Sequence, residues 1–328
     1  MIISKTPYRI SFFGGGSDYP EWYFENGGEV LSSTIDKYIY ISCRYLPHFF
    51  NHKHRIVWSK LETVKKTSEI KHNAVRELLN LMKIKKGMEI HYDGDLPAMS
   101  GMGSSSSFVV GLVNAMYCHC KRKLNKNKLA KISVDLERNI LKETVGSQDQ
   151  VAASFGGFNK IQFFPGGKFK VITLTSNNNY LNQLNKNLIL IYTGIKRTAN
   201  DVASKYVNQL SKNKKEEMNS ILSLVKDAEY IIKNKQLDEF GYLLNESWEL
   251  KKSLSKHISS NLLNNIYEKA MINGAIGGKI LGAGGGGFFL FYVPRRNKER
   301  FLKYFNNYAT VPFKFNKNGS KIIFQQND

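Results

Sequence analysis

Apolar residues follow two different periods along this chain, and the period predicts the local structure. Residues 2–13 are apolar and rich in β-forming residues, and they run into Gly14-Gly15-Gly16, which predicts a strand and a turn. Six further stretches have the composition or alternation of strands: 30–46, 55–58, 87–95, 158–164, 168–174 and 188–192. Of these, 158–164 and 168–174 are expected to be the two arms of a hairpin. The first sixty residues are therefore expected to be mainly strands.

Apolar residues at helical spacing predict helices elsewhere, as in residues 68–82. Further helices are expected from the serine-rich turn at 100–107 through Cys120, and over 127–144, 198–210, 214–233, 236–256 and 259–272. Two strands around a glycine run, then a last helix and strand, complete the chain. Strands interleaved with helices in both halves predict an α+β fold, divided into residues 1–165 and 166–328.

Composition bounds the class of protein. The chain has 328 residues, 42% of them hydrophobic, which is enough to fill a sizeable core and excludes wholesale disorder. Its three cysteines, Cys43, Cys118 and Cys120, are an odd number and indicate a reducing compartment. The longest apolar stretch, 108–118, is well short of the roughly 20 residues that cross a bilayer. A cytoplasmic protein without a membrane partner is expected.

The charge is strongly positive, with 48 Lys plus Arg against 27 Asp plus Glu and a net charge of +21. Such a balance is typical of nucleic-acid-binding proteins. However, only ten of the basic residues are Arg, and Lys occurs together with Asn, as in residues 121–131 and 209–217. This pattern favours solvated, lysine-rich helix faces and no nucleic-acid partner. A nucleic-acid-binding α+β protein is the rival hypothesis from another function class.

The first loop with candidate chemistry follows the N-terminal strand. It places the cation Arg9 before Gly14-Gly15-Gly16-Ser17 and the acid Asp18. Glycine has no Cβ, so a small polar ligand can approach the backbone closely. The alternative is an ordinary hairpin turn with a capping Asp.

A second loop, residues 97–107, lies between a predicted strand and a predicted helix. Its glycines let backbone N–H groups converge, and the helix N-terminus behind them carries partial positive charge, so the loop suits a phosphate. It lacks the Gly-Lys-Ser/Thr of a Walker A loop. The alternative is a serine-rich cap and linker.

The third loop has five glycines in the six positions 282–287, directly before a hydrophobic strand. So many glycines are costly in chain entropy and usually indicate close backbone approach. The apolar flanks argue against a flexible linker.

Two acids lie between the second and third loops. Glu137 is on a predicted helix, and Asp149 follows twelve residues later, beyond Gly146. Phosphoryl transfer needs Mg²⁺ ligands and a group beside the attacking hydroxyl, and these acids can supply them. The alternative is that both are solvated or capping acids.

With TPYRISFFGGGSDYP, LPAMSGMGSSSSFVVG and KILGAGGGGF in this order, the chain resembles the GHMP family of small-molecule kinases over essentially its full length. The first segment looks most like the D-glycero-D-manno-heptose 7-phosphate kinases. The resemblance implies a ribosomal-S5-like N-domain that binds ATP and a ferredoxin-like C-domain, with the site in the cleft.

The resemblance also implies an activity: ATP- and Mg²⁺-dependent phosphorylation of the C1 hydroxyl of the phosphosugar to the 1,7-bisphosphate, on the route to GDP-heptose for surface polysaccharide. The runner-up is a related sugar 1-kinase of the L-fucokinase or galactokinase kind. The oligomeric state stays open, with a homodimer as one candidate.

Carried over by position, the resemblance implies roles for individual residues. Arg9 and Asp149 would be catalytic, and Glu137 and Ser105, or its neighbour Ser104, would bind Mg²⁺. The residues that would cradle the ATP phosphates are Gly101, Met102, Gly103, Ser104, Ser105 and Ser106. Those expected near the sugar are Gly14, Gly15, Gly16, Ser17, Asp18, Gly284 and Gly285.

A heptose 7-phosphate also needs a cation for the phosphate that it already carries. Arg197 follows a predicted strand and precedes a predicted helix, and its planar fork suits phosphate, so Arg197 is the expected contact. Lys196 and Arg44 are weaker candidates, and a solvated Arg197 is the alternative. Trp58 is a candidate for adenine contact. The Cys118-His119-Cys120 and 48–54 histidine groups are not expected to bind metal.

Overall fold

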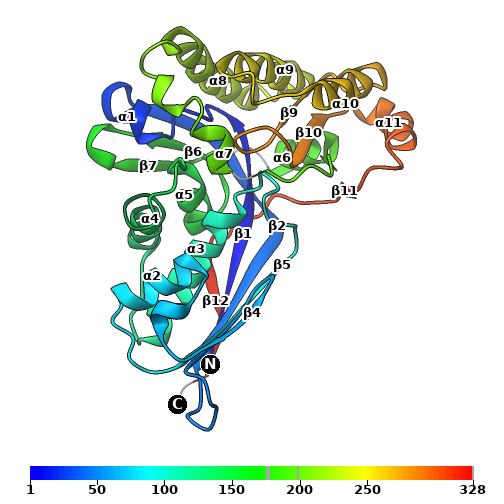
Figure 1. Cartoon of the computed structure of the whole chain (residues 1–328). Helices are drawn as coiled ribbons and strands as arrows, with labels where there is room; N and C mark the ends of the chain where they lie inside the picture. The colour runs from blue at the N-terminus through cyan, green and yellow to red at the C-terminus, as the bar shows by residue number, and fades with distance from the viewer. Residues whose placement is uncertain (175–177, 198, 327–328) are drawn as a thin grey trace.

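Two β-sheets with helices packed against them form the fold of the computed structural model (Figure 1). The structure describes residues 1–174, 178–197 and 199–326. The expected α+β class is confirmed. Within the described residues, no helix is both long enough and apolar enough to span a lipid bilayer.

The larger sheet has eight strands and contains the N-terminal strand in its interior. Along its main path the order is β12-β1-β2-β5-β3-β4, and β6 pairs with β2 and β7. The long strand β2 pairs with β6 through its first residues and with β5 through its last ones. The strands are β1 (Ile2–Phe13), β2 (Gly28–Tyr45), β3 (His54–Val57), β4 (Leu61–Val64), β5 (Met88–Gly94), β6 (Phe158–Phe163), β7 (Phe169–Thr173) and β12 (Lys321–Gln325).

The smaller sheet is antiparallel, in the order β11-β8-β10-β9. Its strands are β8 (Leu188–Tyr192), β9 (Gly277–Ile280), β10 (Phe288–Tyr292) and β11 (Thr310–Val311). Every residue of β10 is buried, as expected of a central strand that carries five apolar residues in a row.

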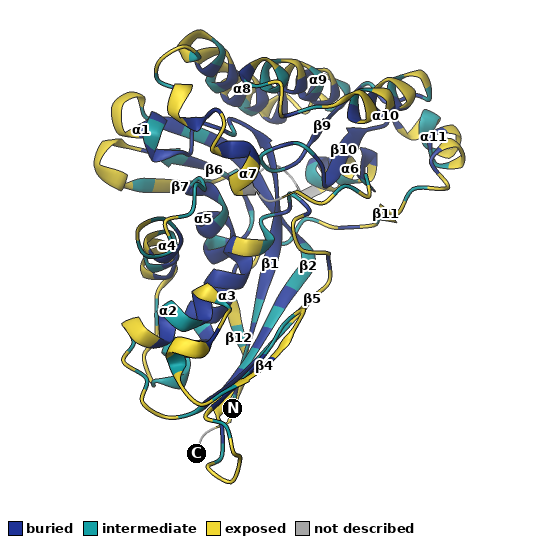
Figure 2. Cartoon of the chain, viewed as in Figure 1, coloured by how far each residue is buried: buried dark blue, intermediate teal, exposed yellow. Residues whose placement is uncertain are grey.

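The helices cover the sheets and connect them. They are α1 (Pro20–Asn26), α2 (Asn73–Leu81), α3 (Ser104–His119), α4 (Lys126–Asp135), α5 (Gln148–Phe155), α6 (Asn178–Asn187), α7 (Ala199–Ala203), α8 (Lys215–Lys233), α9 (Leu237–Leu254), α10 (Asn261–Ile272) and α11 (Lys298–Tyr304). Helix α3 packs on β1 and β2, whereas α9 contacts both β9 and β1 and so spans the two sheets. Figure 2 shows that α8 and α9 are buried on one face and exposed on the other.

Most predicted elements are confirmed, including β1 with the bounds 2–13. The first sixty residues are mainly strands, as expected, and they also contain α1, which starts at Pro20, a residue favoured in the first turn of a helix. Two expectations were wrong. The helix expected over 127–144 has ended by residue 140, after a π-helical turn. In 198–210 only α7 and a 3₁₀ turn form, and Thr198 lies outside the described residues.

Helices α5 and α6 and strand β4 were not predicted. Helix α5 and strand β4 are short and lack a clear apolar period, whereas α6 is rich in asparagine, a poor helix former. The chain ends in two strands where one was expected, and β12 pairs with β1. The division at residues 165 and 166 stays a prediction. Strands β7 and β12, which follow this point in the sequence, both belong to the larger sheet.

Candidate active site

The centre of the site is an ion pair between Arg9 and Asp149, which are 140 residues apart in sequence. Arg9 lies on β1 with only 3% of its surface exposed, and Asp149 lies in the first turn of α5. The guanidinium donates Nε–H to Oδ1 of Asp149 at 2.6 Å and Nη2–H to Oδ2. Its Nη1 donates to the carbonyl oxygen of Gly101 at 2.7 Å. One buried cation therefore joins the acid to the serine-rich loop (residues 97–107).

The serine-rich loop delivers the N-terminus of α3 to the same place. Gly101 and Gly103 have positive φ values of 79° and 74°, which glycine adopts without strain. Gly103 is the N-cap residue of α3, and no side chain of the described residues caps this helix. The first backbone N–H groups of a 16-residue helix are therefore available to an anion.

The glycine loop (residues 281–287) lies directly against the serine-rich loop. A Cβ on Gly282 would stand 2.7 Å from the Cα of Gly101, and a Cβ on Gly101 would stand 2.5 Å from the Leu281 carbonyl oxygen. Phe288 N–H also donates to the Ser100 carbonyl oxygen at 3.1 Å. The close approach predicted for the third loop is thus, in part, an approach of one backbone to another.

Glu137 is fully buried behind this loop, in the π-helical turn Leu136–Ile140. Ser105 Oγ donates to its Oε1 at 3.1 Å, and Gln150 Nε2 donates to its Oε2. Burial raises the pKa of Glu137 to about 8, although hydrogen bonds from Ser106 and Gln150 oppose the shift. No basic side chain pairs with it within 1–174, 178–197 and 199–326. Its carboxylate and the Ser105 hydroxyl are hard oxygen donors of the kind that Mg²⁺ prefers.

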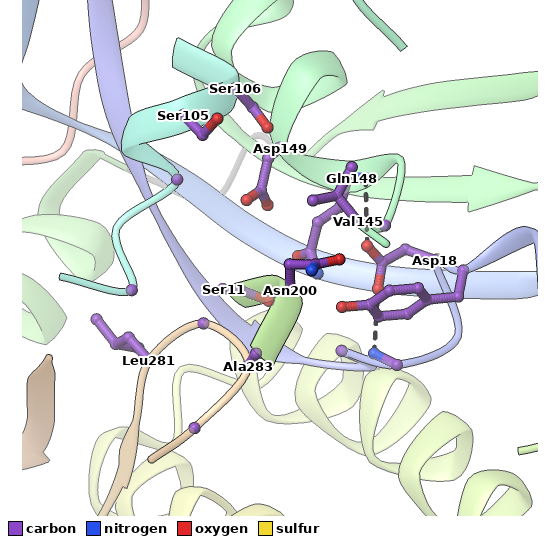
Figure 3. Close-up of a pocket in the computed structure, with 18 of the residues that line it drawn as sticks. Ser11, Asp18, Ser105, Ser106, Val145, Gln148, Asp149, Asn200, Leu281 and Ala283 are labelled. Carbon is purple, nitrogen blue, oxygen red and sulfur yellow. Dashed lines mark hydrogen bonds between the residues drawn. The ribbon is translucent and has the colours of Figure 1, made fainter. Parts of the chain in front are cut away.

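Asp18 is the second buried acid of the site, with 1% of its surface exposed. Its Oδ1 accepts Gly16 N–H at 3.0 Å, and its Oδ2 accepts Gln148 N–H at 3.3 Å (Figure 3). Burial, and then the neighbouring Asp149 charge, raise the pKa of Asp18 to about 6. These contacts hold the N-terminal glycine turn against the start of α5.

Two lysines contribute further positive charge. Lys279 on β9 is 5% exposed and donates from Nζ to the Phe12 carbonyl oxygen and to Ser247 Oγ. Lys251 on α9 donates from Nζ to the carbonyl oxygens of Ile280 and Gly282, at 2.9 and 2.6 Å. Burial and the Arg9 charge lower the pKa of Lys279 to about 7.

Apart from Glu137, these groups line a cavity of about 650 Å³ between the N-terminal glycine turn (residues 14–17), the serine-rich loop, the glycine loop and α9. Figure 3 shows part of this cavity, with Asp18, Ser105 and Asp149 among its labelled residues. This volume lies within the range of small-molecule sites. The sequence-predicted residues that line it are Arg9, Gly15, Gly16, Asp18, Gly101, Gly103, Ser104, Ser105, Ser106, Asp149, Arg197 and Gly284.

Five other predicted site residues are not among the described residues that line the cavity: Gly14, Ser17, Met102, Glu137 and Gly285. Gly14 and Ser17 hold the turn, because the Ser17 hydroxyl donates to the carbonyl oxygens of Gly14 and Glu29. Met102 belongs to the hydrophobic core. Gly285 packs between Val202, the His257 carbonyl and Arg197.

The weaker candidates lie elsewhere. Arg44 pairs with Glu89 on the larger sheet and does not line the cavity, which does not favour it as the contact of a sugar phosphate. Lys196 and Trp58 also do not line the described cavity. No group of three or more His, Cys, Asp or Glu suited to a metal ion occurs within the described part of the chain.

The structure adds residues that the sequence reasoning missed, namely Gln148, Lys251 and Lys279. Gln148 precedes Asp149 and is 8% exposed, and its Oε1 has no hydrogen-bond partner within the described chain. Lys279 stands directly before the glycine loop, and this proximity was the signal that could have drawn attention to it. Lys251 carried no such signal, because it comes from a helix about 30 residues upstream.

Comparison with known proteins bears on this arrangement. The family of the GHMP kinases N terminal domain matches residues 64–157. The D-glycero-alpha-D-manno-heptose 7-phosphate kinase of Campylobacter jejuni is 30% identical, with 98% of each chain covered. The bifunctional fucokinase/GDP-fucose pyrophosphorylase of Arabidopsis thaliana is 25% identical over 91% of this chain and 30% of its own length. A D-glycero-D-manno-heptose 1-phosphate kinase from Bacteroides thetaiotaomicron shares the fold, with a TM-score of 0.81 at 24% identity and full coverage of both chains.

Proposed function

This chain is an ATP-dependent sugar kinase of the GHMP family, and we propose that it phosphorylates the C1 hydroxyl of D-glycero-D-manno-heptose 7-phosphate. The product would be the 1,7-bisphosphate, an intermediate for GDP-heptose and surface polysaccharide. The observation that carries the proposal is the 30% identity to the Campylobacter enzyme across 98% of both chains. Its counterpart in the structure is a cavity that places an acid and several cations together.

Asp149 and Arg9 are the proposed catalytic residues. The C1 oxygen attacks the terminal phosphorus of ATP, the bond from that phosphorus to the bridging oxygen breaks, and ADP leaves. The hydroxyl proton passes to the Asp149 carboxylate. Because both oxygens of this carboxylate are held by one guanidinium, its position is set before the sugar binds. Such positioning and charge neutralisation account for most of phosphoryl-transfer catalysis.

The serine-rich loop is the proposed site of the ATP phosphates. Residues 101–106 include two glycines with positive φ and the uncapped first turn of α3. Backbone N–H groups and the helix dipole favour negative charge there. Met102 would contribute through its backbone only, since its side chain is in the core.

Ser105 and Glu137 would hold Mg²⁺. A buried carboxylate without a basic partner fits a cation, because ionisation in a low-dielectric site needs a compensating charge. When bound, Mg²⁺ would neutralise charge on the ATP phosphates. Ser105 lines the cavity and Glu137 lies behind it, so the serine is the more direct contact of the two.

The sugar is proposed to lie between Asp149 and Asp18. Asp18 would accept hydrogen bonds from sugar hydroxyls, the N-terminal glycine turn would give close backbone approach, and Gly284 and Gly285 would shape the far wall. Arg197 is exposed and lines the cavity, so a phosphate carried by the sugar could reach it. We propose that Arg197 contacts this 7-phosphate.

The experiment that tests the acceptor is a panel of hexoses, heptoses and their terminal phosphates, assayed for ADP release. The product's phosphate position is then assigned by NMR. Release that requires D-glycero-D-manno-heptose 7-phosphate, with phosphate appearing on C1, supports the proposal. The similarity to a plant fucokinase makes L-fucose the second candidate, so L-fucose and D-galactose belong in the panel. Turnover of one of these without the phosphosugar would replace the proposed acceptor.

Several expectations stay proposals beside this one. They are the cytoplasmic location, the absence of a nucleic-acid partner, a homodimer as the candidate assembly, and the domains 1–165 and 166–328. The first domain would bind ATP.

A further inference from the structure

Lys251 and Lys279 present two ammonium groups to the cavity, and the mechanism above uses neither. They come from different elements, α9 and β9, and both line the cavity. Lys279 Nζ donates to the Phe12 carbonyl oxygen and to Ser247 Oγ, and Lys251 Nζ donates to two carbonyl oxygens at the start of the glycine loop. An ammonium group has three N–H donors, so each lysine retains one.

Within the described residues, neither Lys251 nor Lys279 has an acidic partner for its positive charge. Arg9 is paired with Asp149, but neither lysine forms an ion pair with any residue in the described ranges. Their partners are all neutral oxygens. The three cations also lie close enough to affect one another: after burial, the charges of Lys279 and Arg9 lower the pKa of Lys251. Arg9, Lys251 and Lys279 thus form a cluster of three basic groups at the cavity, and within the described residues only Arg9 of the three has a carboxylate partner.

A buried positive charge without a counter-charge is costly, and a bound anion would remove that cost. Asp18, Glu143 and Asp201 also line the cavity, but within the described residues no carboxylate forms an ion pair with either lysine. An anion can reach both lysines through the cavity, because both contribute to its wall. Gly282, which accepts a hydrogen bond from Lys251, lies against Gly101 of the serine-rich loop, so such an anion would sit next to the nucleotide site.

We propose that Lys251 and Lys279 form a binding site for a phosphate group on the part of the cavity wall contributed by α9 and β9. Two phosphates of the same chemistry can occupy it: the terminal phosphoryl group of ATP, or the phosphate carried by the sugar. The second source rests on the proposed function, whereas the first requires only that the chain is a kinase.

A purely structural role makes a different prediction. Lys251 ties Ile280 and Gly282, and Lys279 ties the end of β1, so both could serve only to hold the glycine loop in place. In that case their replacement would lower stability or impair all ligands alike. A phosphate site instead predicts a loss that is confined to ligands with one particular phosphate group.

The test uses Lys251→Gln and Lys279→Gln, which keep a hydrogen-bond donor and remove the charge. Lys252→Gln is the matched control, because Lys252 is the next residue of α9, pairs with Glu249 and does not line the cavity. Lys251→Arg keeps the charge. Thermal unfolding first identifies the folded variants. Lys251 is only half-buried, so its variants are expected to fold. They decide the test if Lys279→Gln does not fold.

Each arm compares two ligands that differ by one phosphate. In the nucleotide arm, calorimetry gives the ratio of Kd for ADP to Kd for AMP-PNP. In the sugar arm, steady-state kinetics give the ratio of KM for the sugar without its phosphate to KM for the phosphosugar found by the substrate panel. We expect one of the two ratios to fall about tenfold or more in both glutamine variants, because each variant loses a charge-assisted hydrogen bond to the phosphate. In Lys252→Gln and Lys251→Arg the same ratio should stay near the wild-type value.

The arm that changes identifies the source of the phosphate. If both ratios match wild type in folded Lys251→Gln, the proposal is overturned and the lysines are structural. Failure of the proposed acceptor is recognised separately, because it shows in the wild-type substrate panel and leaves the nucleotide arm intact. If that panel finds no phosphosugar substrate, the nucleotide ratio alone decides the outcome.

Discussion

Gly146 lies so close to Asp18 that a Cβ placed on Gly146 would overlap Oδ2 of the Asp18 carboxylate. Asp18 in turn accepts Gln148 N–H, and its own carbonyl oxygen accepts Ser147 N–H at 2.8 Å. The N-terminal glycine turn and the segment before α5, about 130 residues apart in sequence, are therefore fitted to each other at the sugar side of the cavity.

Gly146→Ala is expected to displace Asp18, because the backbone of residue 146 cannot move away without breaking the hydrogen bonds of its neighbours. Overpacking of this kind typically costs about 1–3 kcal/mol of unfolding free energy. We expect KM for the sugar to rise while KM for ATP stays within about twofold. Denaturant unfolding and steady-state kinetics would measure both effects. An unchanged sugar KM in the alanine variant would show that Asp18 does not contact the sugar.

Asp149→Asn should lower turnover far more than nucleotide binding. The amide cannot take the hydroxyl proton, and it can no longer accept two hydrogen bonds from Arg9. Loss of a general base typically costs about 10²–10⁴-fold in rate. Kinetics and nucleotide titration would separate the two effects, with Asp227→Asn on the exposed side of α8 as the control. Nearly normal turnover would remove Asp149 from its proposed role.

Sugar binding should strengthen as the pH rises through about 6, the value to which burial raises the pKa of Asp18. Below that pH the protonated acid accepts hydroxyl groups poorly. Because the folded-state pKa is raised, the stability that this group contributes is complete below about pH 4, near its unfolded pKa, and is lost as the pH rises through about 6. The measurement is KM for the sugar between pH 5 and 8, with KM for ATP as the internal control. A flat profile for the sugar would argue against ionised Asp18 as its partner.

Arg197→Ala should raise KM for the phosphosugar by about tenfold, the usual scale for one charge-assisted hydrogen bond. The unphosphorylated sugar should be unaffected. Lys196→Ala is the neighbouring control, since Lys196 is exposed but does not line the cavity. Equal KM values for Arg197→Ala and wild type would leave Arg197 as a solvated residue.

Gln148→Leu should relax selectivity for a sugar hydroxyl. The buried Gln148 amide oxygen has no partner within the described chain, and the residue precedes Asp149, so it suits the hydroxyl beside the reacting carbon. We expect wild type to bind the 2-deoxy substrate about tenfold more weakly than the parent sugar, because an unmatched buried polar group is costly. In the leucine variant this ratio should approach one. Gln162→Leu, on β6 outside the cavity, is the control, and an unchanged ratio in Gln148→Leu would refute the role.

Local signals in the sequence were sufficient for much of the fold. The apolar, β-forming composition of residues 2–13 predicted β1, and the helical spacing in 214–233 predicted all of α8 with one extra residue at its start. Helix α5 was missed, although it positions Asp149. Its eight residues are mostly buried all round and carry no apolar stripe that could be read from sequence.

The sequence by itself determined which segments can approach an anion: glycines that tolerate positive φ, a serine-rich start of a helix, and acids and an arginine nearby. These are properties of single residues and short spacings. Only the tertiary structure decided which of them meet. Pairing of Arg9 with Asp149, burial of Glu137 behind Ser105, and convergence of Lys251 and Lys279 on one wall depend on contacts between residues 28 to 140 positions apart. Burial and charge proximity, which set the pKa values of these groups, exist only after the two sheets and α9 have packed.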